Sequence, residues 1–440
     1  MSSMFKEETV KYPELRALEN EIATCFRCSL CKMVPLPVFK SKEFSTICPI
    51  NTHYAFHSYS ASGFGYMALA LSEGRIEADR TLADIVFSCR TCGYCDMACK
   101  FIMESERNEV NMALREALVR EGLAPAEYKE MVRLLKETGS PAGAPSGSAG
   151  EWAYGLDLKK LPEQKAQVLL YGGCMTRGDK KAMVSARKLA KLLVNAGVDV
   201  GILGADELCC GLPAHWAGFK DDFVQCAGKN ASTLDRSGVK TIVTVCGACL
   251  GTARALYPRY GITPRTEVVH ATELLERLIR KKKIRLPRPV NIKATYHDPC
   301  YLGRRSEPYE EWKGEEKTVF GQMKYFDPPK KIRYGTEGVF DAPRNILKSI
   351  KELSFREMFR IREYSHCCGG GGGQSPLYDE MSLRAARDRV GEARAVGADY
   401  LVTACSHCKT HLGKACGDND DKGMRVVDII DIVYQAAGLE

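Results

Sequence analysis

Cysteine is the residue whose spacing carries the most chemistry in this sequence of 440 residues. Five cysteines recur in the same order in two successive segments: a lone cysteine, an adjacent pair, then Cys-x2-Cys. The copies comprise Cys174, Cys209, Cys210, Cys246 and Cys249, followed by Cys300, Cys367, Cys368, Cys405 and Cys408. Neither a disulfide framework nor a zinc site predicts an adjacent pair in the middle of such a set. Since a pair held side by side suits a cluster with bridging thiolates, the copies predict two metal clusters.

A second kind of cysteine pattern occupies the first hundred residues. Cys-x2-Cys-x2-Cys wraps the backbone around a [4Fe-4S] cube, and a remote cysteine supplies the fourth ligand, often to the other cluster. Zinc is the rival metal, but a third cysteine at this spacing has no place in a tetrahedral zinc site. Lys100 stands where a compact ferredoxin has proline, and a long insertion separates the two groups. We predict that one [4Fe-4S] cluster is bound by Cys25, Cys28, Cys31 and Cys99, and the other by Cys89, Cys92, Cys95 and Cys48.

Short β-rich runs lead into the repeated cysteines. QVLLYGGC ends at Cys174 and IKATYHDPC ends at Cys300, while GVKTIVTVCGAC and GADYLVTACSHC match almost position by position. Helical segments such as 181–195 and 378–396 alternate with these runs, which indicates α/β units with parallel strands. The cysteines would then lie at the carboxyl ends of the strands, where open α/β sheets form their crevices.

We therefore expect an α+β multidomain protein. A helical two-cluster domain at 1–138 is followed by a linker at 139–161, whose first part, GSPAGAPSGSAG, lacks charge and is typical of a flexible segment. Two repeated α/β domains, 162–290 and 291–440, follow in a pseudo-twofold relation. The gap between Cys300 and Cys367 is the long one, and an insertion at about 304–340, rich in charged and aromatic residues, accounts for it. We expect a surface loop with some helix there, with partner binding as the second interpretation.

Composition limits where the protein works. The N-terminal sequence is charged and lacks a signal-peptide core, so clustered cysteines in a reducing cytoplasm are expected to bind metal. No stretch of 18 or more apolar residues could span a bilayer, and any membrane association would come through a partner. The formal charge is +8, to which the run 281–285 contributes as a solvated helix end or as a landing site for an acidic partner.

The motifs resemble those of the CCG-domain family. Both Cys-Cys-Gly sequences, 209–211 and 367–369, match, as does HDPCYLG at 297–303. A two-cluster domain ahead of two such domains is similar to the D-type subunit of heterodisulfide reductase, and the N-terminal part resembles the helical ferredoxin domains of succinate dehydrogenase and heterodisulfide reductase. The resemblance covers almost the whole chain. It implies that each five-cysteine set holds a non-cubane [4Fe-4S] cluster and that a disulfide substrate binds between the two.

The resemblance also implies partners. No Gly-x-Gly-x-x-Gly opens a helix after a strand, so we expect no flavin on this chain and an FAD-containing subunit within a hetero-oligomeric, anaerobic complex. Class II benzoyl-coenzyme A reductase complexes contain a similar subunit. The leading hypothesis is an oxidoreductase subunit that reduces a disulfide or only relays electrons. The alternatives are the iron-sulfur relay of an FAD-linked glycolate or lactate dehydrogenase, and a nucleic-acid-binding protein, which no module supports.

Two further features stand beside the ligands. The run Gly369–Gly373 is either a floppy loop or a means for backbone N–H groups to approach cluster sulfurs, and we favour the second. His297, His366 and His407 each lie within three residues of a cysteine ligand. They are candidate proton donors for the reduction of a disulfide, or structural histidines, and the sequence does not separate these roles.

Overall fold

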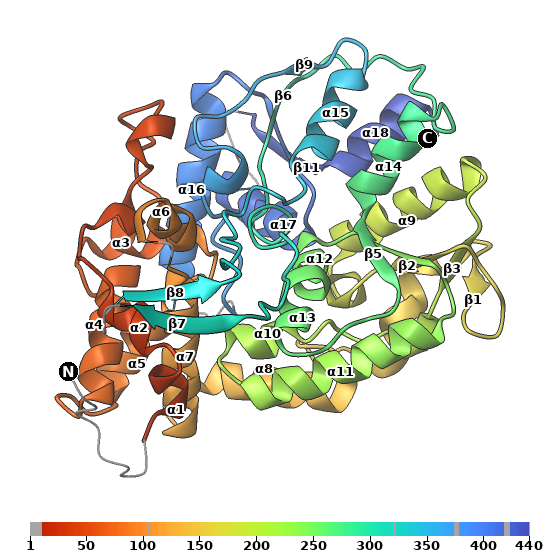
Figure 1. Ribbon diagram of the computed structural model, residues 1–440. Helices are drawn as coiled ribbons and strands as arrows, with labels where there is room; N and C mark the ends of the chain where they lie inside the picture. Colours follow the sequence, from red (N-terminus) through yellow and green to blue (C-terminus); the bar gives the residue numbers. More distant parts are fainter. Residues whose placement is uncertain (1–10, 104, 320–322, 374–377, 418–422, 440) are drawn as a thin grey trace.

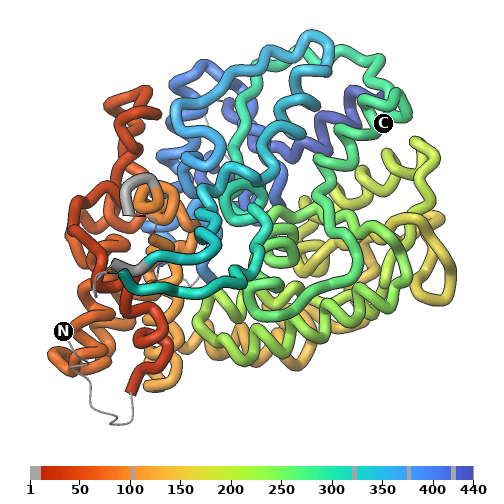
Figure 2. The backbone as a smooth tube through the Cα atoms, viewed as in Figure 1, coloured from red at the N-terminus to blue at the C-terminus, as the bar shows by residue number. Residues whose placement is uncertain are grey.

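The computed structural model describes residues 11–103, 105–319, 323–373, 378–417 and 423–439. Its first part, the N-terminal helical domain (residues 11–138), lies at one side of the molecule, against two α/β units (Figures 1 and 2). The longest helix of this domain, α7, carries Val110, Leu114 and Leu118 on a face with no solvent exposure, so it forms the centre of the domain. The helices are α1 (Pro13–Arg16), α2 (Glu19–Ala23), α3 (Pro49–Tyr54), α4 (Ala61–Ser72), α5 (Arg80–Phe87), α6 (Tyr94–Met103), α7 (Arg107–Arg120) and α8 (Ala126–Thr138).

Side-chain caps fix where two of these helices begin. The Ser60 hydroxyl accepts a hydrogen bond from the Gly63 amide at the start of α4, and the Asp79 carboxylate accepts one from the Leu82 amide, 2.7 Å away, at the start of α5. Such caps satisfy backbone donors that have no partner within the helix.

The first α/β unit (162–290) is built on a parallel sheet of order β1-β3-β2-β4-β5, whose outermost strand β1 comes from the preceding connection. The central strands pair in register, with Val168 opposite Thr241 and Tyr171 opposite Thr244, just before the cysteines that follow. The strands are β1 (Lys159–Lys160), β2 (Val168–Tyr171), β3 (Val200–Ile202), β4 (Thr241–Thr244) and β5 (Glu267–His270). The helices are α9 (Lys180–Asn195), α10 (Leu212–Trp216), α11 (Lys220–Arg236), α12 (Gly247–Gly251), α13 (Tyr257–Arg259) and α14 (Ala271–Arg280).

The second α/β unit (291–439) repeats this plan with a parallel sheet of order β11-β10-β6-β9. Here too the strand before the lone cysteine, β6, pairs with the strand before the Cys-x2-Cys, β10. The strands are β6 (Lys293–Tyr296), β9 (Ser354–Phe355), β10 (Tyr400–Thr403) and β11 (Arg425–Asp428), and the helices are α15 (Asp341–Ser349), α16 (Asp379–Ala395), α17 (Ser406–Cys416) and α18 (Ile429–Ala437). The expectation of a mixed helix and strand protein with two repeated parallel-sheet units is confirmed.

The two sheets share one core. Leu170 and Val243 of the first sheet belong to the same buried apolar cluster as Tyr296 and Val402 of the second. Since the repeated units pack through this cluster, their strand ends face a common centre.

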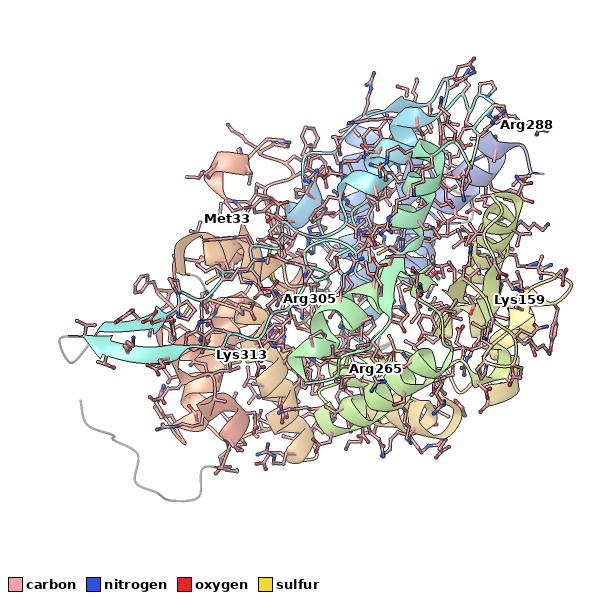
Figure 3. All side chains as sticks on the ribbon, turned by 45° about the vertical axis from the view of Figure 1, so that its right-hand side comes forward. Met33, Lys159, Arg265, Arg288, Arg305 and Lys313 are labelled. Carbon is pink, nitrogen blue, oxygen red and sulfur yellow. The ribbon has the colours of Figure 1, made fainter. Side chains whose placement is uncertain are left out.

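Two connecting segments differ from expectation. The stretch expected to be a flexible linker is packed, because Trp152, which is 1% exposed, anchors a short 3₁₀-helical segment and its carbonyl accepts a hydrogen bond from Arg187. The insertion forms an antiparallel hairpin, β7 (Glu315–Val319) and β8 (Met323–Asp327), so the expectation of helix is wrong for its described residues. Figure 3 shows the hairpin projecting from the body of the molecule, beyond Lys313.

Candidate metal centres

The five cysteines of the first motif meet at the carboxyl end of the first sheet. Their thiols form a continuous series of contacts in the order Cys174, Cys209, Cys210, Cys249 and Cys246. All but Cys174 are buried, and no disulfide joins any of the protein's 20 cysteines. The loop after β2 supplies the lone cysteine, and the start of α12 supplies the last two, because Cys246 directly precedes that helix.

The second motif repeats this arrangement. Cys367 contacts Cys368, which contacts Cys408, which in turn contacts Cys405, and Cys300 lies near Cys368. A contact between Cys246 and Cys405 joins the two motifs. The structure therefore brings all ten cysteines into one buried region shared by the two α/β units.

The N-terminal cysteines lie in two neighbouring groups. Cys25, Cys31 and Cys99 lie close to one another, and Cys28 of the same group is exposed at the surface. The remote thiol Cys48 lies near Cys89 and Cys92, and near Cys31 as well. A further neighbour of Cys89 and Cys92 is Cys95. The four thiols Cys48, Cys89, Cys92 and Cys95 thus lie together, as do three of the first group, Cys25, Cys31 and Cys99, and Cys31 lies near both groups.

One contact links the N-terminal helical domain to the second motif. The thiols of Cys92 and Cys367 are hydrogen-bonded, and this bond, together with the nearby Arg304 guanidinium, lowers the pKa of Cys92 to about 5. Arg304 is 3% exposed and donates to the carbonyl oxygens of Cys92 and Ser365, at 2.8 Å each. Its charge faces Cys92, Cys300 and Cys367. A buried cation thus lies where the two cysteine systems meet.

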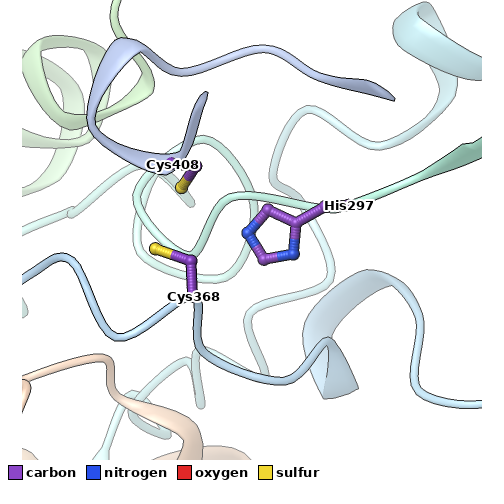
Figure 4. Close-up of side chains that lie close together, drawn as sticks. All are labelled: His297, Cys368 and Cys408. Carbon is purple, nitrogen blue, oxygen red and sulfur yellow. The ribbon is translucent and has the colours of Figure 1, made fainter. Parts of the chain in front are cut away.

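His297 is held in one tautomer beside the second motif. Its Nδ1 accepts a hydrogen bond from Nε of Arg389, 3.1 Å away, so the neutral ring carries its proton on Nε2. The His297 ring meets the sulfurs of Cys368 and Cys408, with the three ligand-type atoms within 4.8 Å of one another (Figure 4). Because Nε2 carries the proton, the ring offers these sulfurs a hydrogen-bond donor and not a lone pair.

The other two candidate histidines have different surroundings. His407 of the second unit bonds the Cys174 thiol of the first; burial lowers its pKa, but this bond and the nearby cysteines raise it to about 9. His366 lies away from such contacts, with Nδ1 3.1 Å from the Arg360 guanidinium and Nε2 3.3 Å from the Asp388 carboxylate. Burial and the Arg360 charge hold the pKa of His366 well below its ordinary value. These contacts tie His366 into a packing network and place His407 at the junction of the two motifs.

Sequence reasoning missed three residues that border this region. Trp216 of α10 donates a hydrogen bond from Nε1 to the Tyr301 hydroxyl at 2.8 Å, and its ring packs edge-on against His407. The side chain of His411 is buried, and its Nε2 would lie 3.0 Å from a β-carbon on Gly369. The available signal was helical spacing, because His411 follows Cys408 by three positions on α17. Trp216 and Tyr301 had no such signal, because each meets its partner only in the folded chain.

The glycine run beside the second motif does two things. The amides of Gly369 and Gly370 donate to the sulfurs of Cys367 and Cys368 at 3.3 and 3.4 Å. Gly372 adopts a φ of +71°, and a β-carbon there would lie 2.7 Å from the Cys89 carbonyl oxygen. The run therefore donates N–H groups to cysteine sulfurs and also lets the loop of the N-terminal helical domain that contains Cys89 approach.

Two side chains of the N-terminal helical domain donate hydrogen bonds to this glycine run. Tyr128 donates from its hydroxyl to the Gly372 carbonyl at 2.9 Å. The guanidinium of Arg115, which has no exposed surface, donates to the carbonyls of Cys89, Gly372 and Trp216 and so joins all three parts of the chain. Hydrogen bonds from Arg115 and Tyr128 thus hold the glycine run beside the loop that contains Cys89.

The donor set fits iron-sulfur clusters. Such clusters require sets of thiolates with N–H donors near their sulfurs, and the protein offers both. The buried Nε2 atoms of His297 and His411 have no hydrogen-bond partner among the described protein atoms, so they are free to bond a group held by the cysteines. No helix in the described part of the chain is long and apolar enough to cross a membrane.

These features define a class of cysteine-rich iron-sulfur proteins, and comparison with known proteins agrees. The cysteine-rich domain family named CCG matches residues 168–254 and 294–413. The D-type subunit of dihydromethanophenazine:CoB--CoM heterodisulfide reductase from Methanosarcina mazei is 30% identical over 429 residues, which are 96% of this chain and 95% of that one. The chain belongs to the family of D-type heterodisulfide reductase subunits and is an iron-sulfur electron-transfer protein.

More distant relatives are longer proteins. A probable iron-sulfur-binding oxidoreductase, FadF, of Bacillus subtilis is 27% identical over 80% of this chain and 46% of its own length. The EtfAB:quinone oxidoreductase of Syntrophomonas wolfei is 26% identical over 80% of this chain and 47% of its own. The chain spans about half the length of these two relatives, so their resemblance supports a redox role and no particular substrate.

Proposed function

We propose that this chain carries electrons between two cubane [4Fe-4S] clusters in its N-terminal helical domain and two non-cubane [4Fe-4S] clusters in its α/β units. The assignment of ligands is the one given by spacing and resemblance. The observation that carries the proposal is the unbroken series of thiol contacts from Cys92 through Cys367 and Cys405 to Cys246 and Cys174. Bound clusters would supply one-electron storage at each site.

The reaction at the shared region would be the reduction of a disulfide to two thiols. This step cleaves one S–S bond and consumes two electrons and two protons, or runs in reverse as the oxidation of two thiols. His407 and His297 are the favoured proton donors, since one bonds Cys174 and the other presents N–H to Cys368. His366 would instead hold the loop in place through Arg360. The names of the D-type relatives support a disulfide substrate.

The electrons would come from a separate flavoprotein. The expected assembly is a cytoplasmic hetero-oligomer with an FAD-containing subunit, and relatives named as reductase subunits support it. The second candidate is a pure relay, as in the iron-sulfur subunit of an FAD-linked 2-hydroxy acid dehydrogenase. It is supported by the relatives whose names describe other oxidoreductases.

Iron analysis tests the cofactor content. Anaerobic purification should give about sixteen irons and sixteen sulfides per chain, from four clusters of four irons. About eight irons, or zinc comparable with iron, would contradict the proposal.

Substitution then separates the sites. Cys367→Ser should remove one distinctive paramagnetic signal and leave the cubane signals. The matched control Cys226→Ser, a thiol outside every motif, should keep all signals. A protein that holds all its iron but passes electrons to no disulfide would favour the relay.

A further inference from the structure

Several large apolar side chains are exposed in the segment that carries Cys28, the exposed cysteine of the first N-terminal group. Of the eleven large apolar side chains most exposed in the described part of the chain, five fall between positions 26 and 56. They are Phe26 (73% exposed), Met33 (47%), Leu36 (81%), Phe39 (38%) and Phe56 (65%), and we call them the apolar collar. Single exposed apolar residues need no explanation, but a group of five within one short segment does.

Specific contacts tie the parts of this segment to one another. Nζ of Lys32 lies 2.8 Å from Nδ1 of His57, which joins the loop after Cys31 to the residue that follows Phe56. The Arg27 guanidinium lies 3.9 Å above the Tyr66 ring, which also faces His57. Met33 bridges to Thr46 and so closes the loop that carries Leu36 and Phe39. Figure 3 shows Met33 at the outer side of the N-terminal helical domain.

The segment that carries the collar has a net positive charge. Between positions 24 and 60 the chain has four cations, Arg27, Lys32, Lys40 and Lys42, and a single carboxylate, Glu43, a net of three positive charges. Arg27, Lys40 and Lys42 are exposed. An apolar centre with a charged rim is the composition of protein interfaces, and a basic rim attracts an acidic partner.

We propose that the apolar collar is the docking surface for an acidic electron-carrying protein, and this inference rests on the proposed function. The exposed Cys28, a proposed cluster ligand, would bring that cluster to the surface in the same segment as the collar. A partner seated there would place its own carrier within a short distance. Interfaces of transient electron-transfer pairs are small, below about 1,200 Å², which suits a surface of five side chains.

The test uses the anaerobic protein with its clusters loaded. A reduced acidic [2Fe-2S] ferredoxin serves as the probe, and stopped-flow absorbance follows oxidation of the probe by the protein. Phe56→Glu, combined with Leu36→Glu, should slow this reaction about tenfold, and added salt should slow the unmodified protein. Phe56→Ser, which adds no charge, should slow it less. Neither position flanks a cysteine ligand, so cluster assembly provides a separate readout.

Tyr154→Glu is the matched control, because Tyr154 is 71% exposed and lies on the connection to the first α/β unit. It should leave the rate within about twofold of the unmodified protein. Equal rates for the collar and control variants would overturn the docking proposal. Binding to anionic phospholipid vesicles that the collar variant abolishes, with the ferredoxin rate unchanged, would assign the surface to a membrane instead. If dithionite also fails to reduce the loaded protein, the proposed function itself is wrong.

Discussion

The donor role of His297 can be tested by removing one N–H group. His297→Leu deletes the donor that faces Cys368 and Cys408, whereas His297→Gln keeps an N–H on a side chain of similar reach. A hydrogen bond to a charged acceptor contributes about 1.5–3 kcal/mol. For one electron a tenfold change in equilibrium is about 59 mV, so this energy corresponds to about 65–130 mV. Because a hydrogen bond from His297 to a loaded site would be present in both oxidation states, we take the figure as an upper limit.

Removal of the donor should destabilise the more negative, reduced form. The potential of the cluster proposed for the second motif should therefore fall by tens of millivolts in His297→Leu and by less in His297→Gln. The assay is a redox titration followed by electron paramagnetic resonance, with the signals of the clusters proposed for the N-terminal helical domain as the internal control. A His297→Leu potential within about 15 mV of the unmodified protein, at full iron content, would refute the argument.

Two further substitutions test contacts that hold the cysteine motifs in place. Glu392 has no exposed surface and pairs with Arg360 and Arg389, at 2.9 and 2.7 Å. Glu392→Gln should therefore lower the free energy of unfolding by about 3–5 kcal/mol, measured by denaturant titration. Burial raises the pKa of Glu392, but the two guanidinium groups outweigh it and the net pKa is lowered. This stabilisation is therefore present above the unfolded pKa of about 4.3 and is lost as the pH falls through the folded pKa, and the variant should lose less stability on acidification. Gly372→Ala puts a β-carbon 2.7 Å from the Cys89 carbonyl, at a φ of +71°, and should lower the melting temperature. An unchanged melting temperature would show that the loop containing Cys89 moves to accommodate the β-carbon.

The sequence predicted the parts of the site that depend on local pattern. The β-rich runs before Cys246 and Cys405 predicted strands, and β4 and β10 end just before these cysteines. Parallel strands whose carboxyl ends share an edge then bring the cysteines together. Periodicity and spacing suffice for this because they act within a few residues of each ligand.

Contacts between distant segments could not be predicted in this way. Nothing near Arg115 indicates that its guanidinium bonds carbonyls of residues 89, 216 and 372, because such partners are chosen only when three domains pack. The insertion shows the same limit. Its charged and aromatic residues led us to expect a loop with some helix, and the pairing of β7 with β8 makes a hairpin instead. The connection around Trp152 is packed because Trp152 is buried, and the Gly-, Ser- and Pro-rich sequence before it gives no sign of that burial.

The two copies of the motif differ where each meets its neighbour. After Cys368 the glycine run leaves room for the cysteine loop of the N-terminal helical domain, because a β-carbon on Gly372 would collide with it. After Cys210 the chain instead enters α10, whose Trp216 fills the junction with Tyr301 and His407 of the other unit. The repeated strands and cysteines thus supply two equivalent sets of sulfurs. The residues after each Cys-Cys pair place one set against the N-terminal domain and the other against the junction of the α/β units.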